Sequence, residues 1–231
     1  MGYLPISVNV DGRRCVVVGG GEVAERKVIE LLRAGARVCV IGPKLTAELH
    51  RLVSAQAFEH IAREWKSGDL KGCVLAFAAT DAPEVQRAIA AEARALHVPI
   101  NVADEPDLCD FITPSVVRRG DLQIAISTSG ASPALASRIR RDLQVIIGPE
   151  YETVTQIMRA ARSYLRTRQR DARERARTLQ AIAASSIVEY VRQADWAAID
   201  TLLKQHLHVG LDTLRIAPRR SQPGEELSRR T

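Results

Sequence analysis

The chain has 231 residues, of which 46% are hydrophobic and 26% are charged. This composition is typical of globular proteins and argues against a disordered or fibrous chain. No run of about 18 apolar residues occurs, so we expect no transmembrane helix. The net charge of +6 is uneven: residues 1–113 hold 13 basic and 15 acidic side chains, and residues 114–231 hold 20 and 12. The basic second half suggests an anionic partner, such as a nucleic acid, a phosphate or a polycarboxylate.

Cysteine usage indicates a reducing compartment. Cys15, Cys39, Cys73 and Cys109 form no Cys-x-x-Cys motif and no Cys/His pairing. Three of them lie in apolar, strand-like runs, where a buried free thiol is the expected state. Residues 1–10 lack the basic region and long apolar run of a secretory signal. We therefore expect a cytoplasmic protein.

Strand and helix patterns alternate over the first half of the chain. Apolar and β-branched runs predict five strands, at residues 14–18, 37–41, 58–63, 73–78 and 99–102. Apolar residues at helical spacing predict helices from Val23 to a stop at Gly35, and over residues 45–55 and 83–96. This alternation is typical of an α/β fold with a doubly wound, Rossmann-like parallel sheet.

The pattern changes after Pro114. Alternating apolar residues predict a strand at 122–126, followed by a hydroxyl-rich loop and a helix that begins at Pro133 behind a Ser132 cap. Everything beyond Gly148-Pro149 has helical spacing, and a frayed tail begins near Ala217. We therefore expect four parts: a Rossmann-like domain, a short mixed α/β segment, a small helical domain and a disordered tail, at residues 1–113, 114–147, 148–216 and 217–231.

A glycine-rich loop follows the first predicted strand. Gly19-x-Gly21-x-x-Ala24 fits the pattern G-x-G-x-x-G/A, and Gly20 lies within it. Glycines permit a tight turn and a close approach of the backbone to a pyrophosphate, while the helix N-terminus offers free N–H groups, here from Glu22 and Val23. The loop predicts dinucleotide binding, and a purely structural strand–helix turn is the alternative.

The second strand lacks the acidic residue that commonly binds the ribose hydroxyls of NAD. It ends in Ile41-Gly42-Pro43-Lys44. We place Pro43 and Lys44 beside the cofactor, where the lysine could tolerate a 2′-phosphate. Lys44 could equally be a solvated loop residue, so the choice between NAD and NADP stays open.

Several motifs, in order, carry a family resemblance. They are Tyr3-Leu4-Pro5-Ile6, Val17–Lys27, Leu32-x-Ala34-Gly35-Ala36, Ala78-Ala79-Thr80-Asp81, Asn101-Val102-x-Asp104, Phe111-Ile112-x-Pro114-Ser115 and Ser127-x-x-Gly130-x-Ser132-Pro133. Over about residues 1–145 the chain resembles the amino-terminal module of siroheme synthase, a module that also occurs as free-standing precorrin-2 dehydrogenase. Because no tetrapyrrole methyltransferase domain follows, it is similar to the free-standing form.

The resemblance implies an activity and an assembly. Precorrin-2, a reduced tetrapyrrole with eight carboxylates, would give a hydride to NAD⁺ and become sirohydrochlorin. Some family members also insert Fe²⁺ to make siroheme, so chelation is a possible second activity. The family forms homodimers with intertwined central segments, which makes residues 114–147 the expected dimerisation segment. The substrate lies between the nucleotide domain and that segment.

The resemblance also assigns site residues. Asp104 follows a strand at the carboxyl edge of the sheet, and it matches the family's key aspartate, the expected general base. A loop aspartate that caps a turn, like Asp107 and Asp110, is the alternative. Thr80 and Asp81 end another strand at the same edge. They could contact the nicotinamide or ribose, cap the helix that begins at Pro83, or do both.

Further residues are expected to bind the substrate. Hydroxyls before a helix N-terminus make an anion site, suited to a tetrapyrrole carboxylate, although a loop with an N-cap is the plainer reading. Arginine forks pair with carboxylates in a bidentate manner. The expected substrate residues are Asn101, Ser115, Ser127, Thr128, Ser129, Gly130 and Arg138.

Two other features point elsewhere. Eight arginines between residues 159 and 177 are the strongest sign of nucleic-acid binding. However, Tyr164 is the one aromatic residue among them, and no nucleic-acid-binding motif occurs. We therefore interpret the arginines as a solvated helix face and expect no nucleic-acid partner. His206-x-His208 has no carboxylate triad beside it, so we expect no resident metal.

Three functions remain to be weighed. The leading one is an NAD-dependent precorrin-2 dehydrogenase. The second is a regulatory or scaffold protein that senses NAD(H) through the same loop, and the third is a nucleic-acid binder with a steep salt dependence. Asn101-Val102-x-Asp104 and residues 127–133 favour the enzyme, because a sensor has no need of them.

Overall fold

The structure is a computed structural model that describes residues 2–217. The chain divides into two compact units, and the division falls after Thr113. Except for Ala217, the predicted disordered tail lies outside the described residues. The finer division into four parts stays a prediction.

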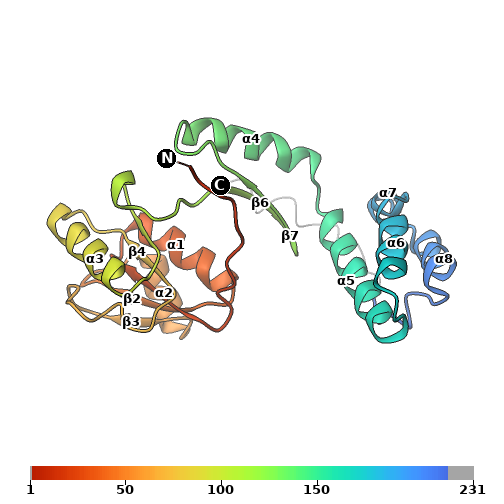
Figure 1. Ribbon diagram of the computed structural model, residues 1–231, viewed down its shortest axis with the longest axis horizontal. Coiled ribbons are helices and arrows are strands. Elements are labelled where there is room, and N and C mark those ends of the chain that lie inside the picture. The colour runs from red at the N-terminus through yellow and green to blue at the C-terminus, as the bar shows by residue number, and fades with distance from the viewer. Residues whose placement is uncertain (1, 218–231) are drawn as a thin grey trace. The chain divides into compact units, whose positions relative to one another are not determined.

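The first unit contains a five-stranded parallel sheet with the order β3-β2-β1-β4-β5 (Figure 1). The strands are β1 (Arg14–Val18), β2 (Arg37–Ile41), β3 (Glu59–Ile61), β4 (Leu75–Ala78) and β5 (Ile100–Val102). The helices are α1 (Glu22–Arg33), α2 (Ala47–Ser54) and α3 (Pro83–Ala95), and a 3₁₀ turn, η1, spans Pro106–Leu108. The predicted Rossmann-like α/β class is confirmed.

Both faces of this sheet are buried, as the continuous apolar runs predict. Alternate strand residues such as Val16 and Ile41 pack with α3 on one face. Their neighbours Val17 and Val40 pack with α1 and α2 on the other. Figure 1 shows these helices around the sheet. The sheet thereby fixes the carboxyl ends of β1, β4 and β5 next to one another.

The four cysteines are free thiols, and Cys15, Cys39 and Cys73 are buried. Burial raises the pKa of all four thiols, and that of Cys73 to about 11. Since the thiolate is the reactive form, these side chains are inert at neutral pH. Three boundaries differ from the prediction by two residues. Strand β3 ends at Ile61 rather than at residue 63. Strand β4 begins only at Leu75, because Cys73 still lies in a turn bonded to Leu70, and α2 begins at Ala47 behind its Thr46 cap.

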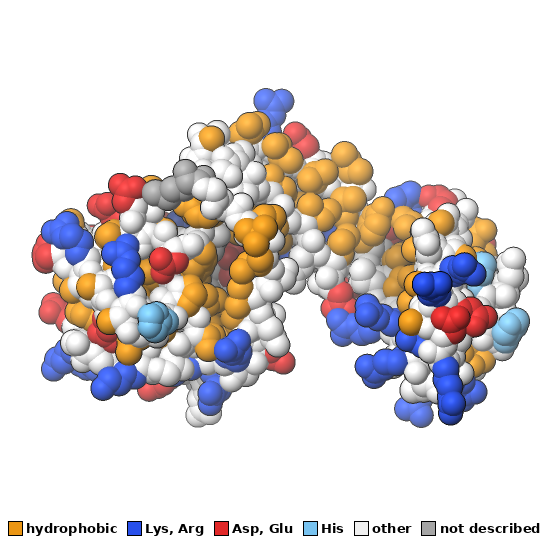
Figure 2. Space-filling model, viewed as in Figure 1, with side chains coloured by type: hydrophobic (Ala, Val, Ile, Leu, Met, Phe, Trp, Pro, Cys, Tyr) orange, Lys and Arg blue, Asp and Glu red, His pale blue; other side chains and the backbone are white. Residues whose placement is uncertain are grey.

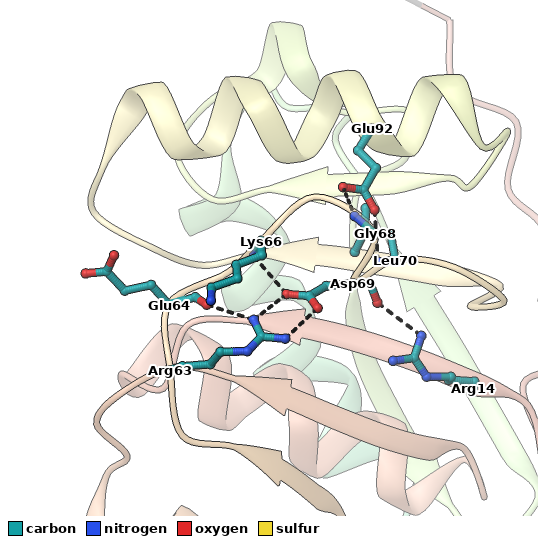
Figure 3. A network of polar contacts seen from close by, with 8 residues as sticks. All are labelled: Arg14, Arg63, Glu64, Lys66, Gly68, Asp69, Leu70 and Glu92. Atoms are coloured by element: carbon teal, nitrogen blue, oxygen red, sulfur yellow. Dashed lines mark hydrogen bonds and ion pairs between the residues drawn. The ribbon is translucent and has the colours of Figure 1, made fainter.

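The crossover from β3 to β4 has no helix and is held by a polar network (Figure 3). Arg63 and Asp69 form a two-bond ion pair at 2.7 and 2.8 Å. Through its hydrogen bonds Arg63 holds the pKa of the Asp69 carboxyl below its usual range. Glu92, on α3, accepts the backbone N–H groups of Gly68 and Leu70, both at 3.0 Å. One carboxylate therefore fastens the crossover to α3.

Replacing Glu92 by Ala is expected to destabilise the first unit by about 2–3 kcal/mol, because two partly buried N–H groups lose a charged acceptor. Urea unfolding followed by Trp65 fluorescence, in a Trp196→Phe background, measures this unit alone. Arg87→Ala is the matched control, since Arg87 is an exposed residue of the same helix, and we expect a change within about 0.5 kcal/mol. An equal effect of both substitutions would contradict the role of Glu92.

The second unit begins with an antiparallel hairpin of β6 (Ser115–Arg119) and β7 (Leu122–Ile126). Strand β7 was predicted, whereas β6 was missed because its two arginines and the following glycine have the composition of a turn. The contacts of the Arg119 side chain explain why these residues form a strand. This side chain donates hydrogen bonds to the carbonyl groups of Gln144 and Ile147, at 2.9 and 2.8 Å. The arginine thus completes the C-terminus of the next helix.

Helices make up the rest of the second unit. They are α4 (Pro133–Ile146), α5 (Glu150–Arg168), α6 (Ala172–Ala183), α7 (Ile187–Arg192) and α8 (Trp196–Leu207). As predicted, Ser132 caps α4 through its side-chain oxygen, and Asp195 caps α8 in the same way. A core that includes Ile157 and Leu203 joins α5 to α8. Over residues 2–217, no helix is both long and apolar enough to cross a membrane.

Candidate functional site

The glycine loop is shaped by the chain's own backbone at two of its three glycines. Gly19 has a φ of +116°, and a Cβ there would lie 2.0 Å from the carbonyl oxygen of Ala79. At Gly20 a Cβ would lie 2.0 Å from the carbonyl oxygen of Lys44. Both positions therefore require glycine for the fold itself.

Gly21 is different, because a Cβ at this position would meet nothing within 4 Å. It is the N-cap residue of α1, and no side chain caps this helix. The backbone N–H groups of the first turn, which includes Glu22 and Val23, consequently have no side-chain acceptor at the cap. Open space in front of an uncapped helix N-terminus is what a bound phosphate requires. The residues present fit a dinucleotide.

The β2 end lies against this loop. The Lys44 backbone touches Gly20, and Thr46 donates its N–H to the Gly20 carbonyl at 3.0 Å. Pro43 and Lys44 have exposed side chains. Because this end carries a lysine where an acid would bind the ribose, the site has no feature that rejects a 2′-phosphate.

A cavity of about 260 Å³ opens at the carboxyl edge of the sheet. It brings together residues from the α1 start and from the β4 and β5 ends, which are Val23, Ala79, Thr80, Asp81, Gln86, Ala103, Asp104 and Glu105. The predicted residues Val23, Thr80, Asp81 and Asp104 therefore share one cavity. The helix-cap alternative for Thr80 and Asp81 is wrong, because Ala82 is the N-cap residue of α3 and no side chain caps it.

Gln86 is a residue of this cavity that sequence reasoning missed. It is buried on α3, and its amide donates to the carbonyl oxygens of Thr80 at 2.7 Å and Ala103 at 3.3 Å. It therefore ties the β4 loop to the β5 loop. Its signal in the sequence is a polar residue three positions before Ile89, on the apolar face of the helix.

The Asp104 carboxylate is not occupied by a structural bond within the described part of the chain. Asp104 is exposed, its φ is +60°, and among residues 2–217 it has no hydrogen-bond or ion-pair partner. Asp110, in contrast, accepts the Ile100 N–H at 3.1 Å and so has a structural role. The left-handed conformation of Asp104 lies in a turn, where aspartate tolerates a positive φ better than most residues.

A second cavity, of about 220 Å³, shares Val23, Ala79, Ala103 and Asp104 with the first. Its other lining residues are Arg26, Lys27, Phe77, Ala78, Asn101 and Val102. The Asn101 amide donates to the Phe111 carbonyl oxygen at 3.0 Å, so its nitrogen is already engaged. Asp104 thus lines both cavities. The first contains further acidic side chains, and the second, which we call the basic hollow, contains Arg26 and Lys27.

The remaining predicted residues lie in the second unit. Ser115 pairs with Ile126 across the hairpin, next to the loop 127–130. In that loop Ser127 Oγ accepts the Ser129 N–H at 3.1 Å, and Thr128 Oγ1 accepts the Ser132 N–H at 3.0 Å. Ser129 and Gly130 both have positive φ, which makes the turn into α4.

These contacts support the plainer reading of the loop, in which the hydroxyls shape an N-cap. Arg138 is exposed on α4 and lies 4.0 Å from Asp142, a weak surface pair. Over residues 2–217, no three His, Cys, Asp or Glu side chains converge in a way that could hold a metal ion. His208 instead ends α8 in the left-handed conformation.

The fold and the glycine loop define a dinucleotide-binding domain of the Rossmann class. Residues 6–115 match the family model described as "Putative NAD(P)-binding". Residues 119–145 match the model described as "Sirohaem biosynthesis protein central".

Full-length relatives extend this match. The siroheme synthase of Thioalkalivibrio sulfidiphilus is 35% identical over 92% of this chain and 44% of its own length. That of Stutzerimonas stutzeri is 37% identical over 90% of this chain, again 44% of its own length. The chain thus belongs with the amino-terminal module of siroheme synthases, as its motifs indicated, and it spans less than half the length of these relatives.

A solved structure has the same fold. It is described as "SirC, precorrin-2 dehydrogenase", and it aligns with 88% of this chain and 98% of its own, with a TM-score of 0.67 and 23% sequence identity. At this identity the similarity supports the fold. It agrees with the sheet, the hairpin and the helical region described above.

Proposed function

We propose that the chain is an NAD-dependent precorrin-2 dehydrogenase of siroheme biosynthesis. Precorrin-2 and NAD⁺ would give sirohydrochlorin, NADH and one proton. The observation that carries the proposal is the first cavity, where the start of α1, Thr80-Asp81 and Asp104 meet. A dinucleotide held by the glycine loop would lie at the same sheet edge as the unpartnered carboxylate of Asp104, which is the arrangement a dehydrogenase needs.

The proposed mechanism divides the work among these residues. Gly21, Glu22 and Val23 bind the pyrophosphate through backbone N–H groups, while Thr80 and Asp81 face the nicotinamide ribose. A bound nicotinamide would supply the hydride acceptor. Asp104 accepts the proton that must leave the macrocycle, and its exposure on a turn keeps the carboxylate free to do so.

The residues that bind the substrate's acidic groups remain a proposal. We propose that the loop Ser127–Gly130 and Arg138 bind carboxylates, with Ser115 and Asn101 beside the ring. The loop's hydroxyl protons and the start of α4 can still face an anion when the hydroxyl oxygens accept backbone bonds. The free thiols fit the reducing cytoplasm as the place of this reaction.

A homodimer would explain the surface of the second unit. Val145 is 86% and Ile146 66% exposed on α4, and Figure 2 shows hydrophobic side chains gathered over this helix. The hairpin β6–β7 is only two strands wide, so each of its strands has an edge that another strand could pair with. We propose that a second copy covers both.

Val145→Glu is therefore expected to convert the dimer to a monomer, since it would bury a charge at the interface. Light scattering after gel filtration would give twice 25.4 kDa for the wild type and 25.4 kDa for the variant. Ala197→Glu, an exposed site on α8, is the control that should stay dimeric. A monomeric wild type would overturn the dimer.

The experiment that tests the function is an anaerobic incubation with precorrin-2 and NAD⁺, then with NADP⁺, followed by absorbance. We expect sirohydrochlorin to form only when a cofactor is present, and the two cofactors reveal which one the Lys44 end accepts. Adding Fe²⁺ to the same sample tests chelation. Nucleotide binding without turnover by a folded protein would overturn the proposal and favour a nucleotide sensor.

A further inference from the structure

The basic hollow beside Asp104 contains a lysine without a counter-ion. Lys27, on α1, is half-buried, and its Nζ donates to Thr113 Oγ1 at 2.5 Å. The Nζ also lies 5.7 Å from the centroid of the Phe77 ring. Over residues 2–217, no carboxylate lies within ion-pair distance of it, and its only acidic neighbour along the helix face is Glu30.

This arrangement is unfavourable for an isolated protein. A partly buried ammonium that is bonded to one neutral hydroxyl loses hydration without gaining an opposite charge. Burial accordingly lowers the pKa of Lys27; the charge of Glu30 offsets part of this lowering, and the charge of Arg26 adds to it. An anion placed in the hollow would supply the missing charge.

The position of the hollow indicates which anion it takes. The lining of the cavity includes Arg26 and Lys27 from α1 together with Asn101 and Asp104 from β5 and the turn after it. It adjoins the cavity of Thr80 and Asp81 but does not include those two residues. The two cavities therefore meet at Asp104, and only the first contains the residues assigned to the nicotinamide end.

We propose that Lys27 and Arg26 form a carboxylate subsite that orients the tetrapyrrole over Asp104. The inference rests on the proposed function, because it names the part of the substrate that this hollow binds. A substrate carboxylate would pair with the Lys27 ammonium, which Phe77 and Thr113 hold in place, and with the exposed Arg26 guanidinium. Lys27 is thus a positioning residue for proton removal by Asp104.

Lys27→Met keeps the aliphatic stem over Phe77 and removes the charge. We expect the KM for precorrin-2 to rise about tenfold, while kcat changes less than threefold. The Kd for NAD⁺ should be unchanged, because the first cavity is intact. Lys27→Arg should restore the KM to within threefold of the wild type. Arg33→Met removes one charge from an exposed position of the same helix and controls for the overall field.

A binding measurement separates this inference from the proposed function. Uroporphyrin, a stable porphyrin with eight carboxylates, can be titrated against the protein by fluorescence quenching. We expect Lys27→Met to bind it at least about fivefold more weakly than wild type or Arg33→Met. If wild type binds uroporphyrin through Lys27 yet does not oxidise precorrin-2, the proposed function fails and the subsite stands.

Several results would overturn the subsite. One is an unchanged KM and an unchanged uroporphyrin affinity in Lys27→Met. Another is a parallel loss of NAD⁺ affinity, which would place Lys27 on the cofactor side. A third is a fall in kcat alone, which would give Lys27 a role in the chemical step. Thermal unfolding of Lys27→Met should match or exceed the wild type, since a poorly compensated charge is removed.

Discussion

Replacing Asp104 by Asn is expected to lower kcat about 10³-fold, while the protein folds and binds NAD⁺ as before. The amide cannot accept the proton that leaves the macrocycle. The fold should be unaffected, because Asp104 makes no bond within residues 2–217 and asparagine also tolerates its φ of +60°. An anaerobic turnover assay measures kcat, and a titration with NAD⁺ measures the affinity for the cofactor.

Asp107→Asn is the matched control for this experiment. Asp107 is an exposed aspartate three residues further on, in η1, outside both cavities. The Asp107→Asn variant should retain full activity. If Asp104→Asn kept more than a tenth of the wild-type rate, Asp104 would not be the base. An equal loss of NAD⁺ affinity would move it to the cofactor site.

Gly21→Asp is expected to weaken NAD⁺ binding about 100-fold or more, because a carboxylate would occupy the space of a phosphate and repel it. The same change should leave the fold as stable as before or add up to about 1 kcal/mol. Gly21 is an N-cap residue in the extended region, where aspartate is a favoured cap, and its Cβ would meet no protein atom. Calorimetric titration and urea unfolding would separate these two effects.

Gly20→Ala, in contrast, should destabilise the fold. Its Cβ would lie 2.0 Å from the Lys44 carbonyl oxygen, so the loop must shift at a cost of about 1–3 kcal/mol. Unchanged NAD⁺ affinity in Gly21→Asp would refute the phosphate assignment of the loop.

The sheet could be predicted from the sequence because each strand carries its own signal. The run Val16–Val18 and the run Ala76–Ala78 are apolar without interruption, as strands buried on both faces must be. Once these strands are parallel, their carboxyl ends meet at one edge. The convergence of Thr80-Asp81 and Asp104 therefore follows from topology, without knowledge of any contact.

The features that escaped prediction depend on contacts between distant residues. Strand β6 was missed because Arg119 looks like a surface residue until the end of α4 meets it. Lys27 and Thr113 are 86 positions apart, and nothing in either segment indicates their hydrogen bond. Gln86 is an ordinary helix residue until two loop carbonyls converge on it. A single sequence shows such residues only as local exceptions to a pattern.

The Gln86 amide has a consequence for motion in the site. It holds the Thr80 carbonyl with one hydrogen bond and the Ala103 carbonyl with another, so the two loops cannot open independently without breaking one of them. Local opening of this edge is therefore cooperative, and both loops share one opening free energy. A cofactor that ordered the loop at Thr80 would also order the turn that carries Asp104, so the proposed base would be held most firmly when the hydride acceptor is bound.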